Sequence, residues 1–238
     1  MQSDADIPRS KSINSRPFRI VVLLFLVVFT LKIFVFDFYR VSSGSMSPAL
    51  LVGDFLVVWE IPFPPLARND VVAFTLPPDA AARNSYETGS VFVKRVAALP
   101  GDVITVQGDS LLVNGIAVGI VPESAGFLTE NHRIIVPSAG TLLDVSPETE
   151  ALWRPLAERE GRSIVVQNRI VFIDGSPAVE YRLTQNCIFV TGDNPADSYD
   201  SRYWGLLPEN AVTGKAVVVY WSSSEESGVR LERIGGVK

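Results

Sequence analysis

The strongest hydrophobic pattern in the chain is a run near its N-terminus, from Ile20 to Phe36, that is interrupted only by Thr30 and Lys32. A helix of this length is roughly 26 Å long, because each residue adds about 1.5 Å. That length is near the lower limit for crossing a bilayer. The run therefore predicts one N-terminal transmembrane helix over residues 20–36.

The residues that flank this run predict its orientation. Residues 1–19 contain four basic and two acidic side chains, and an excess of positive charge marks the cytoplasmic side of a membrane segment. We therefore expect residues 1–19 to be a cytoplasmic tail and the chain from residue 37 onward to be exported. A cleavable signal peptide and a buried core helix are the two alternatives, although no Ala-x-Ala site follows the run.

Beyond residue 41 the pattern changes to short apolar runs separated by Gly, Pro, Asp and Asn. Such runs are typical of an antiparallel β protein, so the fold class that we expect is mainly β. The pair Asn114-Gly115 between two apolar runs predicts a tight hairpin turn. The predicted strands are Phe55–Glu60, Asp70–Thr75, Val91–Ala97, Val103–Gln107, Ser110–Val113, Ile164–Ile173, Val179–Leu183, Cys187–Thr191 and Ala216–Trp221.

Helical signals are scarce in this part of the chain. The best candidate covers residues 146–160, with Ser146 as a cap and Pro147 at the first helical position, although Pro155 should kink or split it. Residues 78–90 and 120–145 resemble surface loops, and residues 223–238 a frayed C-terminal tail.

Composition excludes several classes of function. The net charge is −5 and no basic stripe is present, which argues against a nucleic-acid partner. One cysteine and one histidine exclude an internal disulfide and a Cys/His zinc site, and we expect neither a metal nor a cofactor. The cysteine, Cys187, has apolar neighbours and is expected in the core.

The candidate chemistry is that of a serine nucleophile. A serine hydroxyl needs a positioned base, and the only histidine, His132, lies in the polar sequence Glu-Asn-His-Arg, where a solvated loop residue is expected. The chain has neither a Gly-x-Ser-x-Gly nor a Ser-x-x-Lys motif. The serine chemistry that remains is a pair of serine and lysine.

Lys94 is the lysine that fits such a pair. It lies in an apolar strand, on the same face as Phe92 and Val96, and burial lowers the pKa of an amine because it penalises the charged form. On this segment alone, a lysine at an exposed strand edge explains the pattern as well.

Three sequence blocks together resemble the type I signal peptidase family. The first is Ser43-Gly44-Ser45-Met46-x-Pro48 followed by Gly53-Asp54. The second is Lys94-Arg95-Val96 followed by Leu99-Pro100-Gly101-Asp102. The third is Gly192-Asp193-Asn194 followed by Ser198, Asp200-Ser201-Arg202-Tyr203-Trp204-Gly205 and Pro208-Glu209. These blocks frame most of the chain beyond the hydrophobic run, in the order that the family has them.

The resemblance implies a role for each matching residue. Ser45 is the implied nucleophile and Lys94 the implied general base, while the Ser43 hydroxyl and the Ser45 backbone N–H are the implied oxyanion hole. Ser198 is implied to orient the base. Three further residues are implied to support the site, namely Asp54 at a turn and the ion pair of Asp200 with Arg202.

The chain departs from the family pattern at two places. Ser42 stands where the family usually has proline, and Pro195-Ala196-Asp197 stands where it usually has Arg-Asp-Asn. The second departure bears on how the loop around Ser198 is braced.

Substrate recognition is expected to use an exposed strand edge. An extended peptide can pair with such an edge while alternate side chains enter pockets, and shallow apolar pockets accept small residues at positions −1 and −3, an Ala-x-Ala preference. By resemblance the pocket walls are Val41, Met46, Leu50 and Val93. Met46, residues 49–52 and Trp221 are also expected to touch the lipid bilayer.

The interpretation is therefore a single-pass serine endopeptidase of the bacterial inner membrane, with its catalytic domain outside the cytoplasm, that removes signal peptides from exported preproteins. Its exported domain is expected over residues 37–222, with a signal-peptidase-like catalytic core at about 41–102 and 186–222 and an inserted second β lobe at about 103–185. The alternatives are a maturation peptidase for one conjugative or pilus substrate and a non-catalytic, membrane-tethered binding module.

Overall fold

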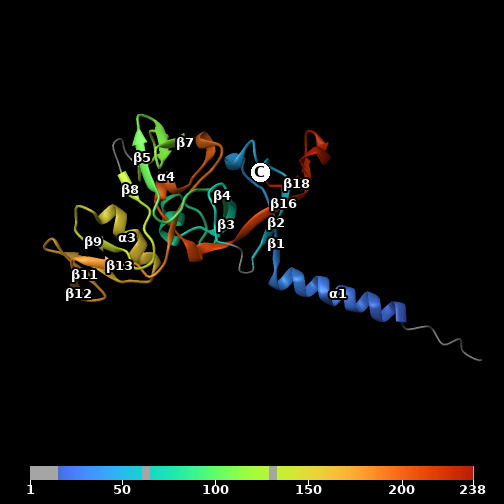
Figure 1. Ribbon diagram of the computed structural model, residues 1–238, viewed down its shortest axis with the longest axis horizontal. Coiled ribbons are helices and arrows are strands. Elements are labelled where there is room, and N and C mark those ends of the chain that lie inside the picture. Colours follow the sequence, from blue (N-terminus) through green and yellow to red (C-terminus); the bar gives the residue numbers. More distant parts are fainter. Residues whose placement is uncertain (1–15, 61–64, 129–132, 238) are drawn as a thin grey trace, which may run out of the picture.

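The computed structural model describes residues 16–60, 65–128 and 133–237. These residues form a body of antiparallel strands from which one helix, α1 (Arg16–Phe34), projects (Figure 1). Every strand pairing in the described chain is antiparallel. The predicted mainly β fold class is therefore confirmed.

The largest sheet has nine strands, and its main path runs in the order β1-β2-β16-β3-β4-β14-β15. Two short strands, β17 and β18, also pair with β16. The strands are β1 (Phe36–Arg40), β2 (Asp54–Trp59), β3 (Val71–Thr75), β4 (Val91–Ala98), β14 (Cys187–Thr191), β15 (Leu207–Pro208), β16 (Val212–Ser224), β17 (Gly228–Val229) and β18 (Gly235–Gly236).

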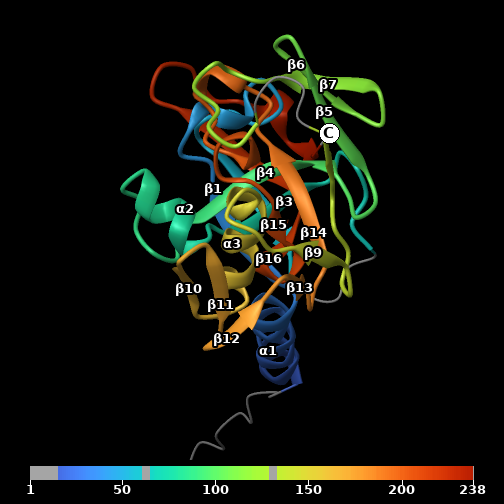
Figure 2. The ribbon, with the colours of Figure 1, turned by 90° about the vertical axis from the view of Figure 1, so that its left-hand side faces the viewer.

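Residues 103–183 form the smaller sheets and a helix, on the side of the body away from α1 (Figures 1 and 2). These elements share a hydrophobic core with β4 and β14, where Ala98, Trp153 and Phe189 are fully buried. The elements are β5 (Val103–Gln107), β6 (Ser110–Val113), β7 (Ile116–Ile120), β8 (Arg133–Ile135), β9 (Leu142–Asp144), α3 (Glu150–Arg159), β10 (Ile164–Gln167), β11 (Ile170–Ile173), β12 (Ser176–Ala178) and β13 (Glu180–Arg182).

The remaining helical segments are short. They are α2 (Pro78–Arg83), α4 (Ser201–Trp204) and the 3-10 turns η1 (Gly44–Met46), η2 (Pro195–Asp197), η3 (Glu209–Ala211) and η4 (Leu231–Arg233).

Most predicted strands are confirmed to within a residue or two, but two of them differ. The predicted strand 164–173 is a hairpin of β10 and β11, because Asn168 and Arg169 take the left-handed backbone with φ of 51° and 64°. The predicted strand 216–221 is the middle of a strand of 13 residues. At Asn114-Gly115 both φ values are positive, 52° and 80°, as the predicted turn requires.

The helix and loop predictions needed larger corrections. Helix α3 starts at Glu150 instead of at residue 147, because the hydroxyls of Ser146 and Thr149 bond to each other and to nearby backbone groups in the turn before it. Pro155 lies inside the helix without ending it. The predicted loop 78–90 contains α2, and the predicted loop 120–145 contains β8 and β9.

The prediction of a frayed C-terminal tail was wrong. Residues 228–236 form β17, η4 and β18 and return to β16. Two arginines of this segment, Arg230 and Arg233, bond to the fully buried carboxylate of Asp54. A charge removed from water requires such partners, and the tail supplies them.

The predicted transmembrane segment, residues 20–36, corresponds mostly to α1. Within residues 16–60, 65–128 and 133–237, no helix combines the length and apolar content that crossing a bilayer requires. The predicted transmembrane helix is therefore not confirmed.

Candidate active site

The serine and lysine that the sequence singled out lie in contact. Ser45 sits in η1, between β1 and β2, and Lys94 sits in β4. Their side-chain atoms, Ser45 Oγ and Lys94 Nζ, are 2.5 Å apart. The exposed fractions of the two residues are 6% and 2%, so the hydrogen bond between them is shielded from solvent.

The pairing of β4 explains why this lysine is at an edge of the sheet. Along Val91–Arg95 one side of β4 pairs with β3. On its other side β14 pairs only with the part from Arg95 to Ala98. Among the described residues, no strand therefore covers that side of β4 from Val91 to Lys94, and Lys94 is the last residue before β14 begins.

Burial changes the protonation of Lys94. Removal of the amine from water lowers the pKa of Lys94 to about 8, and this desolvation outweighs the attraction of the nearby Asp200 carboxylate. At pH 7 roughly one molecule in ten then has a neutral amine, against fewer than about one in a thousand for an ordinary lysine. A neutral amine can accept the Ser45 hydroxyl proton, whereas an ammonium can only donate to that oxygen.

Ser43 lies beside Ser45. Its Oγ is 3.2 Å from Ser45 Oγ, and its side chain is exposed. Between the two serines Gly44 leads directly into the backbone N–H of Ser45. The two oxyanion-hole groups implied by the sequence therefore lie next to the Ser45 hydroxyl.

A buried polar network lies behind the pair. Asp200, which is fully buried, accepts hydrogen bonds from Gly192 N (2.8 Å), Ser198 Oγ (2.6 Å) and Arg202 Nε (2.8 Å). Arg202 is 1% exposed and also donates to the Ile120 carbonyl. Two buried charges without these bonds would be destabilising, so the network holds the loop after β14 in one conformation.

Ser198 does not make the contact that the sequence implied. Its hydroxyl donates to Asp200, and among the described residues the structure gives it no hydrogen bond to Lys94. In this structure Ser198 is thus held by the carboxylate behind the site.

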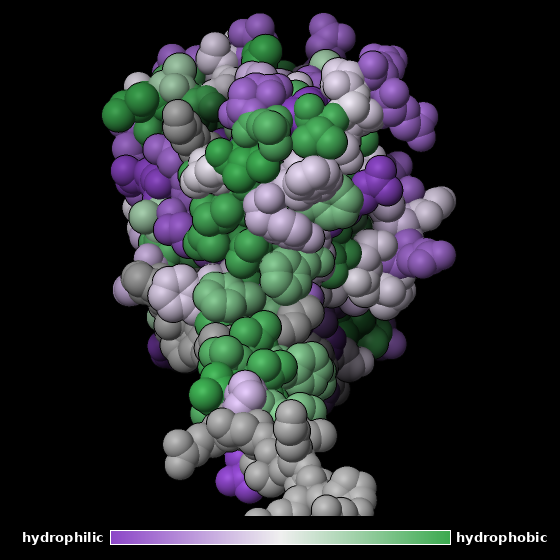
Figure 3. Space-filling view, turned by 90° about the vertical axis from the view of Figure 1, so that its right-hand side faces the viewer, coloured by the Kyte–Doolittle hydropathy of each residue, from purple (hydrophilic) through white to green (hydrophobic). Residues whose placement is uncertain are grey.

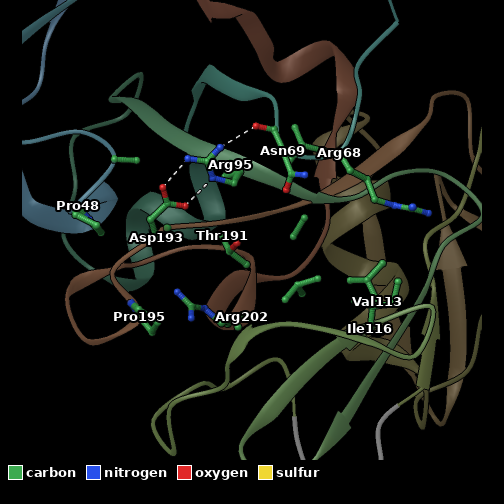
Figure 4. A pocket seen from close by; sticks show the side chains of 16 residues that line it. Pro48, Arg68, Asn69, Arg95, Val113, Ile116, Thr191, Asp193, Pro195 and Arg202 are labelled. Carbon is green, nitrogen blue, oxygen red and sulfur yellow. Dashed lines mark hydrogen bonds and ion pairs between the residues drawn. The ribbon is translucent and has the colours of Figure 1, made fainter. Parts of the chain in front are cut away.

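Two contacts fix the loop that carries this network against Ser45 and β4. A Cβ on Gly192 would lie 2.5 Å from the Ser45 carbonyl oxygen and 2.2 Å from Ser198 Oγ, so only glycine fits there. The guanidinium of Arg95 donates two hydrogen bonds, of 2.7 and 2.6 Å, to the carboxylate of Asp193 (Figure 4). The loop is therefore tied to β4 at the residue after Lys94.

Asp54 lies at the centre of a hydrogen-bond network at the end of the segment that follows Ser45. It accepts hydrogen bonds from Leu51 N and Ser222 Oγ as well as from the two C-terminal arginines. Burial by itself would raise the pKa of Asp54, but the hydrogen bonds, led by that of Arg233, hold it below its ordinary value. Arg233 also donates to the Ala49 carbonyl and so joins the C-terminal segment to the segment that follows Ser45.

The four predicted pocket residues line one cavity. Val41, Met46, Leu50 and Val93 surround, together with Ser45 and Lys94, a space of about 290 Å³. Tyr86 also lines it, which the sequence did not predict because Tyr86 falls in a stretch that resembles a surface loop. The sequence did not predict the role of Arg233 either, since nothing near Arg233 marks a bond to Asp54.

The predictions for Cys187 and His132 differ in whether the structure describes the residue. Cys187 is buried as expected, and burial raises its pKa to about 12. His132 lies outside the described residues. In the described part of the chain, no three His, Cys, Asp or Glu side chains converge as they would to hold a metal ion.

Comparisons with known proteins point to one family. The family model for signal peptidase, peptidase S26, matches residues 15–221. A signal peptidase I of Bacillus caldolyticus is 32% identical, over 82% of this chain and 85% of that protein. A signal peptidase I of Buchnera aphidicola is 25% identical, over 90% of this chain and 78% of that protein.

A solved structure also matches, but weakly in shape. It is the crystal structure of a signal peptidase I from Enterococcus faecalis V583, with 21% identity and a TM-score of 0.31, covering 64% of this chain and 97% of that chain.

Proposed function

The chain belongs to the signal peptidase family, peptidase S26, and from this premise we propose that it cleaves signal peptides from exported preproteins with Ser45 as nucleophile and Lys94 as general base. The observation that carries the proposal is the buried 2.5 Å contact between Ser45 Oγ and Lys94 Nζ. The lowered pKa of Lys94 supports it, because a base must be neutral near the working pH.

In the proposed reaction Lys94 Nζ takes the proton of the Ser45 hydroxyl as Oγ attacks the scissile carbonyl carbon. The carbonyl oxygen becomes an oxyanion, which accepts hydrogen bonds from the Ser43 hydroxyl and the Ser45 backbone N–H. The Lys94 ammonium then gives its proton to the departing amine, which is the N-terminus of the mature protein. Lys94 then takes a proton from water, which attacks the acyl-enzyme ester. The bond to Ser45 Oγ breaks, Lys94 returns the proton to that oxygen, and the signal peptide leaves with a free carboxylate.

We propose that the preprotein binds as an extended strand along the uncovered side of β4 over Val91–Lys94. In that position its main chain can pair with β4, while its side chains at −1 and −3 enter the cavity of Val41, Met46, Leu50 and Val93. The apolar walls of this cavity favour apolar side chains at those positions, and the Ala-x-Ala preference is the form we propose.

The experiment that tests this function is cleavage of a model preprotein with an Ala-x-Ala site by the detergent-solubilised full chain. We expect a single cut after the second alanine, located by N-terminal sequencing of the product. Replacement of the −1 alanine by leucine should reduce kcat/KM at least about tenfold, because the proposed −1 pocket is shaped for a small side chain. Equal cleavage of both substrates would contradict the proposed pocket.

Two alternatives predict other outcomes. A maturation peptidase dedicated to one conjugative or pilus substrate would leave the generic preprotein uncut. A non-catalytic binding module would cleave no substrate, and replacement of Ser45 would leave its function intact. The buried contact of the serine with a lysine favours an enzyme, because an isolated amine is costly to bury without a function.

Attachment to a lipid bilayer is a further part of the proposal. The described side chains of α1 from Phe18 to Phe29 are 40–70% exposed wherever they are large and apolar. Figure 3 shows apolar side chains continuing from this helix onto the adjoining face of the β body. Among the neighbouring strands β1, β2 and β16, the partly exposed aromatic side chains are Phe38, Trp59, Tyr220 and Trp221. Water would disfavour such a surface, and lipid would cover it.

Two of the residues expected to touch lipid, Met46 and Leu50, are buried. Met46 and Leu50 are 2% and 1% exposed, so they line the cavity and are not available to lipid. Val52 and Trp221 are 48% and 40% exposed and remain in the proposed contact. The exported domain, its division at about residues 103 and 185, and a cytoplasmic N-terminus are likewise retained as proposals.

Flotation with phosphatidylethanolamine–phosphatidylglycerol vesicles tests the attachment. We expect the full chain to float with the vesicles in a density gradient and to stay with them at 1 M salt, roughly ten times the concentration at which exposed charges are screened beyond 10 Å. A chain lacking residues 1–34 should float much less. Equal flotation of the two chains would show that α1 does not provide the anchor.

A further inference from the structure

One carboxylate near the nucleophile has no place in the mechanism above. Asp197 ends η2, in the loop between β14 and α4. Its Oδ2 lies 2.9 Å from where a Cβ on Gly44 would stand. Since Gly44 precedes the Ser45 N–H, a negative charge stands directly beside the proposed oxyanion hole.

This carboxylate differs from the other acids of the region in having no partner for its charge. Asp193 forms an ion pair with Arg95, and Asp200 forms one with Arg202. Among the described residues, Asp197 has neither a side-chain hydrogen bond nor an ion pair, and its side chain is exposed. It does act over a distance, because its charge opposes the lowering of the Lys94 pKa. An unpaired carboxylate at a substrate-binding surface is available to a charged ligand.

The position of Asp197 indicates which part of the substrate it meets. The cavity proposed for residues −1 and −3 is lined by Ser42, Ser43, Ser45 and Lys94 but by neither Gly44 nor Asp197. The loop that carries Asp197 instead borders a second cavity, of about 640 Å³, which Pro48, Asp193 and Pro195 line on one side (Figure 4).

The two cavities follow one another along β4. The first is lined by β4 residues up to Lys94, and the second by β4 residues from Arg95 onward. If the residues before the scissile bond fill the first cavity, the residues after the scissile bond extend past η2 and toward the second cavity. Asp197 itself lines neither cavity, and its carboxylate lies beside Gly44, the residue before Ser45.

Building on the proposed function, we propose that Asp197 is a specificity-determining residue that favours preproteins with a lysine or arginine at the first or second position after the scissile bond and disfavours those with an acid there. Opposite charges a few ångströms apart attract and like charges repel, and the effect is moderate where water screens them. We expect a difference of about tenfold in kcat/KM between lysine and glutamate substrates.

The test uses peptides with the same Ala-x-Ala site and with lysine, glutamine or glutamate at position +1. The wild-type enzyme should cleave the lysine peptide about ten times as efficiently as the glutamate peptide, with the glutamine peptide between them. In Asp197→Asn this ratio should fall to within about twofold of one. The matched control, Glu226→Gln, removes an exposed acid in the turn between β16 and β17 and should keep the wild-type ratio.

The use of a ratio isolates the charge preference from other effects of the substitution. Asp197→Asn also changes the charge near Lys94 and near the oxyanion, which alters the rate for all peptides alike and cancels in the ratio. Raising the salt from 0.05 to 0.5 M should shrink the wild-type ratio toward one, since salt screens exposed charges. The same charges placed at −2 or at +6 should give a ratio that does not depend on Asp197.

The outcomes separate this inference from the proposed function. If the wild type cleaves none of the peptides, the proposed function fails. If the wild type cleaves them but Asp197→Asn keeps the lysine-to-glutamate ratio, or if the ratio depends on Asp197 only for charges at −2, the role assigned to Asp197 is wrong while the peptidase function stands.

Discussion

Replacement of Ser45 by alanine should reduce kcat/KM for an Ala-x-Ala preprotein by about 10⁴-fold or more, the range seen when a serine nucleophile is removed. The reason is that no other hydroxyl of the described chain bonds to Lys94: Ser43 Oγ reaches only Ser45, and Ser198 is held by Asp200. The measurement is single-turnover cleavage with excess enzyme, so that slow residual activity is still visible.

The matched control for this variant is Ser47→Ala, two residues further on in the same segment and part-exposed. It should keep nearly wild-type activity, as should His132→Ala. Circular dichroism should show that the Ser45→Ala chain is folded, since the change removes only one oxygen atom. A Ser45→Ala chain that retains more than about a tenth of the wild-type rate would rule out Ser45 as the nucleophile.

Replacement of Lys94 by methionine should lower kcat/KM by between about 10²- and 10⁴-fold, which is the contribution expected of a general base. Methionine fills the buried space that alanine would leave empty, so Lys94→Met tests chemistry more cleanly than Lys94→Ala. The matched control is Lys215→Met, which changes a half-exposed strand lysine whose amine pairs with Asp70. Similar losses in the two methionine variants would contradict a special role for Lys94.

The pH profile of the wild-type enzyme provides the second measurement on Lys94. The active form has a neutral amine, so kcat/KM should rise about tenfold per pH unit on the acid side and level off above the pKa of Lys94, which is about 8. The residual activity of Lys94→Met should lack this rise. A wild-type rate that is flat between pH 6 and 9.5, roughly 1.5 to 2 units on either side of that pKa, would exclude Lys94 as the base.

The lowered pKa of Lys94 also makes the free energy of unfolding depend on pH. The unfolded chain binds a proton on Lys94 up to pH 10.5, whereas the folded chain loses it at about 8. Because the unfolded state holds more protons between these values, the contribution of Lys94 to the free energy of unfolding should increase as the pH rises from 8 to 10.5. Below pH 8 the buried ammonium destabilises the fold, so Lys94→Met should unfold at a higher temperature than the wild type at pH 7.

The sequence alone predicted the class of fold and most of the strands. Alternating apolar runs with turn residues between them located β5, β6 and β14 at their observed bounds, because strand periodicity is a local property of the chain. It failed at 164–173, where two strands follow each other without a glycine or proline between them. Asn168 is the one turn-favouring residue there, and Arg169, which also takes the left-handed backbone, gives no local signal of a turn.

The sequence also pointed to Ser45, through its resemblance to the family, and to Lys94, through its apolar flanks, since both patterns are local. Only the tertiary structure decided that these residues, 49 positions apart, lie 2.5 Å from each other, that Ser198 bonds to Asp200 and not to Lys94, and that Arg233 of the C-terminal segment holds Asp54. The physical reason is that hydrogen bonds, burial and unpaired charges such as that of Asp197 depend on which distant segments the sheet places side by side.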